Sequence, residues 1–313
     1  MSRVAAIDCG TNSIRLLVAD IDGSHLVDVA RRSEVVRLGY GVDATGLIDP
    51  SHMERTLDAC ERYAATCRAT DVERVRFVAT SASRDARNAA EFVAGVERAF
   101  HDFGVTPEVV SGDEEAHLSF SGATGDLIAA GIPAPYLVVD LGGGSTELVR
   151  GRRSVEAGWS MDVGSVRLTE RHLASDPPTE AEIGSATADV DAALDVAERC
   201  VDLSGIATVV GLAGSITTVT AHLLGLTAYD PAAIHLARAG RNDHMAAASE
   251  LLGATREHRA ALPYMHPGRV DVIGAGALVW RRVLDRVGER SPEATVVVSE
   301  HDILDGIALS IAG

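Results

Sequence analysis

The chain contains no lysine, and all 28 of its basic residues are arginine. This absence excludes two kinds of chemistry, because a Walker-A phosphate loop and a Schiff-base enzyme both depend on a lysine. Any phosphate group must therefore be bound by arginine, backbone amides, hydroxyl groups or a metal ion.

Long hydrophobic runs are also missing. No apolar stretch approaches the ~20 residues that a membrane-spanning helix needs, and the N-terminus leads directly into a predicted strand without a signal-peptide pattern. The four cysteines form no Cys-x-x-Cys pair, and the histidines lack metal-ligand spacing. We therefore expect a cytoplasmic protein with reduced cysteines and without structural zinc.

Negative charge predominates, since 45 acidic residues give the chain a net charge of −17. Because like charges repel, this balance argues against nonspecific binding to nucleic acids or to a membrane surface. We expect neither as a partner.

Length and composition predict the fold class. A chain of 313 residues is long for one core, and a hydrophobic fraction of 46% with only 4% aromatic residues suits α/β layers. Predicted strands and helices alternate along the whole chain. We expect two α/β domains, at 1–125 and 126–313, with a cleft between their strand ends and with a helix at about 301–313 that packs back on the first domain.

The most informative motif is Asp-Leu-Gly-Gly-Gly-Ser-Thr-Glu at 140–147, directly after the apolar run 136–139. Three successive glycines let the backbone approach a ligand closely and direct several N–H groups into one concavity that suits an anion. Ser145 and Thr146 add hydroxyl donors, and Asp140 and Glu147 are oxygen ligands suited to Mg²⁺. A plain hairpin turn is the alternative, but a two-residue turn needs far less glycine.

A second copy of this motif occupies residues 8–13, which read Asp-Cys-Gly-Thr-Asn-Ser after the apolar run 4–7. Each copy is a strand, a tight polar turn and a returning strand. An ordinary capped turn rich in Thr and Asn would explain the first copy alone. Two copies in one chain predict a duplicated half-domain that binds phosphate from both sides. Superposition pairs Asp8 with Asp140, Gly10 with Gly142, and Ser13 with Ser145.

A third loop, at residues 211–218, follows a predicted strand and opens a helix. Backbone amides at a helix N-terminus bind anions readily, which makes Gly214 and Ser215 candidate phosphate contacts. Gly-Ser pairs are common at strand-to-helix turns, so an ordinary turn explains this loop equally well.

Acidic residues open the helix predicted after residue 111. Ser111 and Glu114 match a capping box, so Glu114 has a structural explanation. Glu115 does not share that role, and a carboxylate held rigidly on a helix can orient and deprotonate a water molecule. The alternative is a first-turn acid favoured by the helix dipole.

Arg84 lies where a predicted strand leads into a helix over about 84–100. From that junction its guanidinium could neutralise a phosphoryl group. A solvated arginine at the start of a helix is the alternative.

Together these segments resemble the exopolyphosphatase and guanosine pentaphosphate phosphohydrolase family, within the superfamily of sugar kinases, chaperone ATPases and actin. The resemblance covers essentially the whole chain, and Glu-Glu-Ala shortly before the glycine motif is its specific part. It implies two actin-like (ribonuclease H-like) α/β domains. The matching segments are 6–13, Ser83-Arg84 with Asn88, 111–116, 140–147 and 211–215.

The resemblance also implies hydrolysis of a terminal phosphoanhydride bond. Glu115 would be the general base and Arg84 would stabilise the transferred phosphoryl group. Asp140 and Glu147 would hold Mg²⁺, and a monovalent cation such as K⁺ is a further candidate cofactor. The phosphate-binding residues would be Asp8, Gly10, Thr11, Asn12, Ser13, Gly142, Gly143, Gly144, Ser145, Gly214 and Ser215.

The substrate stays open at this point. The chain resembles the short form of the family, without the helical domains that extend the polyphosphate channel in longer members. Inorganic polyphosphate, guanosine pentaphosphate and nucleotides are therefore all candidates, and a homodimer is one candidate assembly. Two other functions are an ATP-dependent kinase of the same superfamily and a non-catalytic regulator that binds polyphosphate or the alarmone.

Overall fold

The computed structural model describes residues 2–23 and 25–311 and divides the chain into two compact units. Unit 1 comprises Met1–Gly122 and Ile303–Gly313, and unit 2 comprises Ala123–Asp302. The division falls inside helix α5 (Gly112–Ala129), close to the boundary expected at 125/126. Residues 312–313 of the helix expected at 301–313 lie outside the described residues.

The sheet of unit 1 has the strand order β3-β2-β1-β4-β5. The first three strands form an antiparallel meander, and β4 and β5 continue it in parallel to β1. Because side chains alternate across a strand, both faces of β1 are apolar and buried. The strands are β1 (Ser2–Cys9), β2 (Ser13–Asp22), β3 (His25–Val35), β4 (Arg74–Ala79) and β5 (Glu108–Val109).

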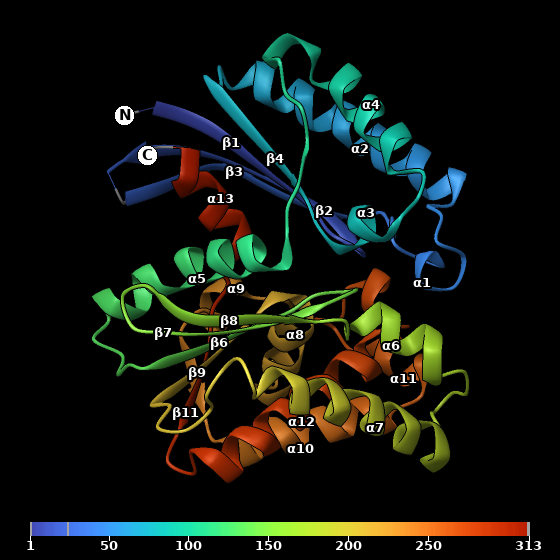
Figure 1. The fold of residues 1–313 in the computed structure, drawn as a ribbon, viewed down its shortest axis with the longest axis vertical. Helices are drawn as coiled ribbons and strands as arrows, with labels where there is room; N and C mark the ends of the chain where they lie inside the picture. The colour runs from blue at the N-terminus through green and yellow to red at the C-terminus, as the bar shows by residue number, and fades with distance from the viewer. Residues whose placement is uncertain (1, 24, 312–313) are drawn as a thin grey trace. The chain divides into compact units, whose positions relative to one another are not determined.

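Helices cover both faces of this sheet (Figure 1). One face packs against α2 (Pro50–Ala69) and α4 (Ala89–Ala99), and the core there includes Tyr63, Phe77 and Phe92. The other face packs against α13 (Ile303–Ile311) and Leu118 of α5. The remaining helices of unit 1 are α1 (Val42–Thr45), α3 (Ser81–Asp85) and the short η1 (His101–Phe103).

The sheet of unit 2 has the order β10-β11-β9-β6-β7-β8. Read from β8, this order repeats unit 1: an antiparallel meander, then two strands parallel to its third member. Strand β10 is an addition that pairs antiparallel with β11. The strands are β6 (Tyr136–Leu141), β7 (Thr146–Gly151), β8 (Val155–Met161), β9 (Thr208–Leu212), β10 (Ala237–Ala239) and β11 (Thr295–Val298).

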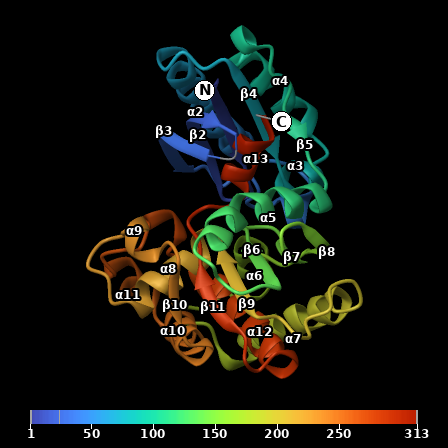
Figure 2. The ribbon, with the colours of Figure 1, turned by 90° about the vertical axis from the view of Figure 1, so that its left-hand side faces the viewer.

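Helices α7 and α12 lie below strands β6 and β7 in Figure 2. Buried apolar side chains of the sheet and of the helices of unit 2 form one extended core. Trp280 of α12 is a fully buried member of this core. The helices of unit 2 are α6 (Ser165–His172), α7 (Glu180–Ala197), α8 (Ala213–Leu223), α9 (Pro231–Ile234), α10 (Arg241–Gly253), α11 (Arg256–Ala261), the short η2 (Pro267–Arg269) and α12 (Ile273–Arg290).

The predicted α/β class with two sheets is confirmed, whereas the predicted cleft between the domains stays a prediction. One helix was wrong: the stretch 84–100 forms two helices, α3 and α4. Ala86 has an extended backbone, and the Asn88 side chain bonds both backbone groups of Ile48. The chain is thus held out of the helix at 86–88.

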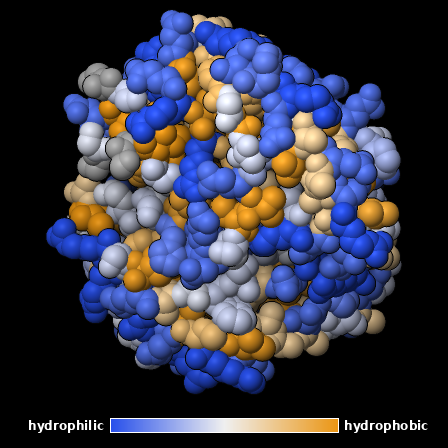
Figure 3. Space-filling view, turned by 45° about the horizontal axis from the view of Figure 1, so that its top comes forward, coloured by the Kyte–Doolittle hydropathy of each residue, from blue (hydrophilic) through white to orange (hydrophobic). Residues whose placement is uncertain are grey.

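On the face in Figure 3, hydrophobic residues occur in small areas among hydrophilic ones. Within residues 2–23 and 25–311, no helix combines the length and the hydrophobicity that a membrane crossing requires.

Candidate active site

The first candidate turn connects β1 to β2. The Gly10 N–H donates to the Ser13 carbonyl at 2.9 Å, which closes the turn. Asp8, at the end of β1, is 5% exposed and lies directly across the sheet from Arg15. Arg15 donates to the Asp8 carboxylate from both Nε and an Nη, at 3.0 and 2.7 Å. The carboxylate is therefore neutralised within its own hairpin.

This turn is attached to the beginning of α3. Thr11 Oγ1 and Ser81 Oγ share a hydrogen bond of 2.8 Å. Among the described residues, Asn12 Oδ1 and Ser83 Oγ are buried without a hydrogen-bond partner. A buried polar atom without a partner is costly, and a bound ligand or water would satisfy it. Both atoms are thus suited to contact a polar ligand.

Arg84 and Glu115 form an ion pair. An Nη of Arg84 donates to Glu115 Oε2 and to the Val110 carbonyl, both at 2.8 Å. The Glu115 side chain is 10% exposed, and the guanidinium fixes its orientation. Glu114 points elsewhere, because its carboxylate pairs with Arg76. Its N–H bonds Ser111 Oγ, which is one of the two bonds of the predicted capping box, and the carboxylate does not make the other. The two predicted catalytic residues are therefore in direct contact.

The second turn, between β6 and β7, repeats the geometry of the first. The Gly142 N–H donates to the Ser145 carbonyl at 3.0 Å, as Gly10 does to Ser13. Within the described part of the chain, the N–H groups of Gly143 and Gly144 have no protein acceptor. These amides are available to an anion.

The carbonyls of the same turn are bonded to the N-terminus of α6. The Gly142 carbonyl accepts from the Ser165 N–H, and the Gly143 carbonyl accepts from Val166 and Arg167. A Cβ on Gly164 would lie 2.5 Å from the Gly143 oxygen, so only glycine fits there. The hydrogen bonds from α6 and the close packing of Gly164 thus fix the backbone of the turn.

Asp140 and Glu147 lie directly opposite each other on β6 and β7 and are 6% and 1% exposed. Glu147 Oε1 accepts from Ser160 Oγ at 2.7 Å. Opposed carboxylates repel, which a divalent cation would relieve. In the first turn the equivalent of Glu147 is Arg15, which supplies this positive charge itself. The donor set at 140 and 147 therefore fits Mg²⁺.

The third loop follows the carboxyl end of β9, and this end lies beside the second turn because β9 and β6 are parallel neighbours. Ala213, the first residue of α8, has φ 65°, a strained conformation for a residue with a side chain. A Cβ on Gly214 would lie 2.3 Å from the guanidinium carbon of Arg269. Ser215 is 7% exposed and packs against Gly276 of α12.

Arg269 is the functional candidate that the sequence analysis missed. Its guanidinium lies over Gly214 and donates to Thr218 Oγ1 at 3.3 Å. It comes from η2, more than fifty residues beyond the loop, so local sequence patterns carried no signal for it. A cation at this place suits the binding of a phosphate.

The predicted site residues thus gather in two sets, one in each unit. In unit 1, Arg84 and Glu115 meet beside the turn at 8–13, because β1, β4 and β5 are parallel and have their carboxyl ends on the same side of the sheet. In unit 2, the pair Asp140–Glu147 and the glycine turn lie beside the loop at 211–215. The catalytic and binding roles assigned to these residues stay predictions.

Comparison with known proteins extends these observations to the whole chain. It is 51% identical over 319 residues to Exopolyphosphatase 2 of Mycobacterium tuberculosis, covering 100% of this chain and 99% of that protein.

Solved structures are similar as well. The fold matches an exopolyphosphatase-like protein with a TM-score of 0.95 and 45% identity, over 99% of this chain and 97% of that one. It also matches the Aquifex aeolicus PPX-GPPA enzyme with a TM-score of 0.79 and 30% identity, over 99% of both chains. The model of the Ppx/GppA phosphatase family matches residues 17–311. The chain therefore belongs to the Ppx/GppA phosphatase family.

Proposed function

We propose that this protein is an exopolyphosphatase-type phosphohydrolase that removes the terminal phosphate of inorganic polyphosphate. The observation that carries the proposal is the Glu115 carboxylate, nearly buried and oriented by Arg84 beside a turn with a buried, unpartnered Asn12 oxygen. The name of the 51% identical relative, Exopolyphosphatase 2, supports the same substrate class.

Glu115 acts as the general base. Held at 2.8 Å by Arg84, its carboxylate has a fixed direction from which it can take a proton from the attacking water. Arg84 then has a second role, because its guanidinium can also stabilise the negative charge of the phosphoryl group that is transferred. Phosphoryl transfer depends on positioning and charge neutralisation more than on covalent chemistry, which suits these residues.

The phosphates are bound by backbone amides and hydroxyl groups. The N–H groups of Gly143 and Gly144, and the turn at 8–13, contact the terminal phosphates. Asp140 and Glu147 would hold Mg²⁺, which would neutralise phosphate charge and help to place the water when bound. Arg269 beside Gly214 supplies the positive charge that lysine provides in a Walker-A loop.

The test is phosphate release from polyphosphates of defined length, guanosine pentaphosphate and ADP, side by side with Mg²⁺. We expect turnover of polyphosphate with the highest kcat/KM. Glu115→Gln keeps the hydrogen-bond acceptor for Arg84 but loses the base, so its kcat should fall about 10²–10⁴-fold with little change in thermal stability. Near-wild-type turnover of this variant would refute the assignment of Glu115.

The same assay distinguishes the other functions. Faster hydrolysis of guanosine pentaphosphate than of polyphosphate would move the assignment to the alarmone. Incubation with ATP and an acceptor that yields a phosphorylated product in place of free phosphate would identify a kinase. Binding of polyphosphate without any turnover would identify a regulator.

A further inference from the structure

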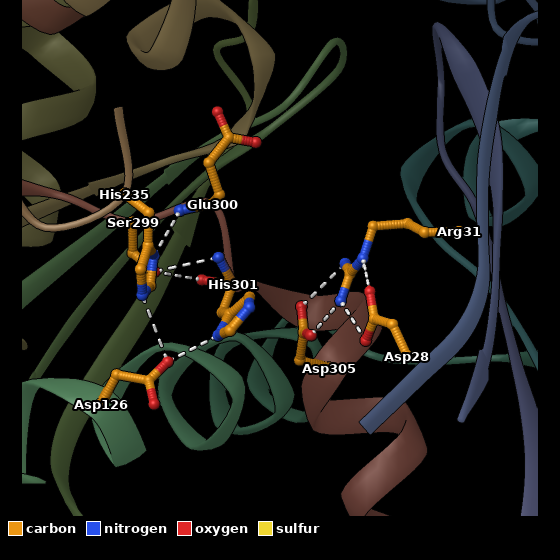
Figure 4. Close-up of polar contacts among 8 residues, drawn as sticks. All are labelled: Asp28, Arg31, Asp126, His235, Ser299, Glu300, His301 and Asp305. Atoms are coloured by element: carbon orange, nitrogen blue, oxygen red, sulfur yellow. Dashed lines mark hydrogen bonds and ion pairs between the residues drawn. The ribbon is translucent and has the colours of Figure 1, made fainter. Parts of the chain in front are cut away.

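Three side chains of unit 2 that no part of the proposed function uses converge on one point (Figure 4). They are Asp126 in α5, His235 directly after α9, and His301 after β11. The potential ligand atoms of all three lie within 4.8 Å of one another. Asp126 Oδ2 is 2.6 Å from His301 Nδ1 and 3.4 Å from His235 Nε2.

The sequence gives no hint of this cluster. His235 lies 109 positions after Asp126 and 66 positions before His301, so the three residues show no metal-ligand spacing along the chain. The fold brings them together, with the two imidazole centroids 4.6 Å apart. The side chains are between 23% and 43% exposed, which leaves the point accessible from solvent.

We propose that Asp126, His235 and His301 form a binding site for a divalent transition-metal ion of the Zn²⁺ class. Two imidazoles and one carboxylate are a donor set that Zn²⁺ and its neighbours prefer, whereas Mg²⁺ requires mainly oxygen ligands. Around a tetrahedral ion with bonds of about 2.0–2.2 Å, ligand atoms lie about 3.3–3.6 Å apart. The 3.4 Å contact already meets this spacing. Water would fill the fourth position.

Metal binding changes the protons of the cluster in a defined way. The Glu300 N–H donates to His235 Nδ1 at 3.3 Å, so neutral His235 carries its proton on Nε2, toward Asp126. For Nε2 to coordinate an ion, this proton must move to Nδ1, and the long contact with the Glu300 amide must open. The proton that His301 Nδ1 shares with Asp126 likewise moves to His301 Nε2, and the 2.6 Å contact lengthens.

The ion would link two segments that are distant in sequence. Asp126 belongs to the second half of α5, and His301 belongs to the segment 299–302 that follows β11. Since an ion that binds only the folded state stabilises it, the melting temperature should rise with metal concentration.

The direct test uses Co²⁺ as a spectroscopic probe of the full-length protein, stripped of metal and kept in excess Mg²⁺. Excess Mg²⁺ occupies carboxylate sites such as Asp140 and Glu147. We expect one equivalent of Co²⁺ to give the intense visible absorption of a tetrahedral ion, and Zn²⁺ to displace it. His235→Ala and His301→Ala should each abolish the absorption. His258→Ala, which removes an exposed histidine of α11, should leave it unchanged.

A milder variant guards against misfolding. Asp126→Asn keeps the shape and a hydrogen-bond acceptor but removes the charge, so Co²⁺ affinity should fall at least tenfold while the metal-free melting temperature is retained. Nitrogen NMR of the His235 ring should show its proton on Nε2 without metal and on Nδ1 with Zn²⁺. Absorption typical of hexaaquo Co²⁺, or equal binding by the wild type and the His301→Ala variant, would overturn the proposal.

Discussion

Arg15 and Glu147 occupy the same position in two equivalent hairpins, and each lies directly across the sheet from an aspartate. In the first hairpin the result is an ion pair of 2.7 Å. In the second it is a pair of buried carboxylates. A single difference in residue type thus gives one hairpin an internal ion pair and the other two opposed carboxylates, which is the donor set of the proposed Mg²⁺ site.

Glu147→Gln should therefore affect stability in opposite directions with and without Mg²⁺. In EDTA the variant should melt a few degrees above the wild type, because one buried negative charge is removed. Excess Mg²⁺ should raise the melting temperature of the wild type more than that of the variant. The Mg²⁺ concentration for half-maximal activity should be at least tenfold higher in the variant.

Thermal melts and Mg²⁺ titrations check this, with Glu156→Gln as the matched control. Glu156 lies on the neighbouring strand β8 and is half-exposed beside Arg150. Glu156→Gln should have the same Mg²⁺ dependence as the wild type, both in its melting temperature and in its activity. The same Mg²⁺ dependence in Glu147→Gln and wild type would contradict the assigned metal site.

The Arg84–Glu115 pair should behave as one functional unit. Arg84→Met removes both the orientation of Glu115 and the charge for the phosphoryl group, so we expect kcat to fall about 10²–10³-fold. In the double variant with Glu115→Gln, the loss should be much smaller than the product of the two single losses. Steady-state kinetics of the four proteins measure this, and independent, multiplicative effects would show that the contact has no role in turnover.

Gly214→Ala tests the place of Arg269. The added methyl group would lie 2.3 Å from the guanidinium carbon, and because that group ends a flexible side chain, it should swing away at little cost in stability. We expect KM for polyphosphate to rise several-fold with a smaller change in kcat.

The matched control is Gly184→Ala, in the interior of α7. Its new Cβ would meet nothing within 4 Å, so helix propensity alone should stabilise the protein by about 0.5–1 kcal/mol without any change in KM. An unchanged KM in Gly214→Ala would contradict a role for Arg269 in phosphate binding.

His244 should make the stability of the protein dependent on pH. It is 1% exposed, and within the described residues neither ring nitrogen has a hydrogen-bond partner. Burial lowers its pKa from 6.5 to about 4. Below pH 6.5 His244 binds a proton in the unfolded chain but stays neutral in the folded protein. Stability is therefore lost as pH falls from 6.5 toward 4, by about 3 kcal/mol in all.

Denaturant unfolding of His244→Phe between pH 7 and 4 checks this. Phenylalanine keeps an aromatic ring against Trp280, which packs edge-on to the imidazole at 5.9 Å between ring centroids. The variant should lose less stability than the wild type over this range, whereas the exposed His258→Ala should follow the wild type. Parallel curves for His244→Phe and wild type would contradict a neutral, buried His244.

What the sequence predicted, and what it did not, follows from the range of the interactions. Both hairpins and their glycine turns were predictable, because strand alternation and turn chemistry act between near neighbours. The break at 86–88 was not, since Asn88 bonds Ile48 forty positions away. The sites of Arg269 and of the pair His235–His301 were not predictable for the same reason, because only the tertiary structure brings these residues to their partners.

The bonds from the start of α6 to the Gly142 and Gly143 carbonyls have a thermodynamic consequence. Glycine loops are usually mobile, and ordering them on a ligand lowers its affinity. Here the peptide planes are locked when the chain folds, so the entropy is lost then and not when phosphate arrives. A loop with three glycines can in this way be as rigid as the strands it connects.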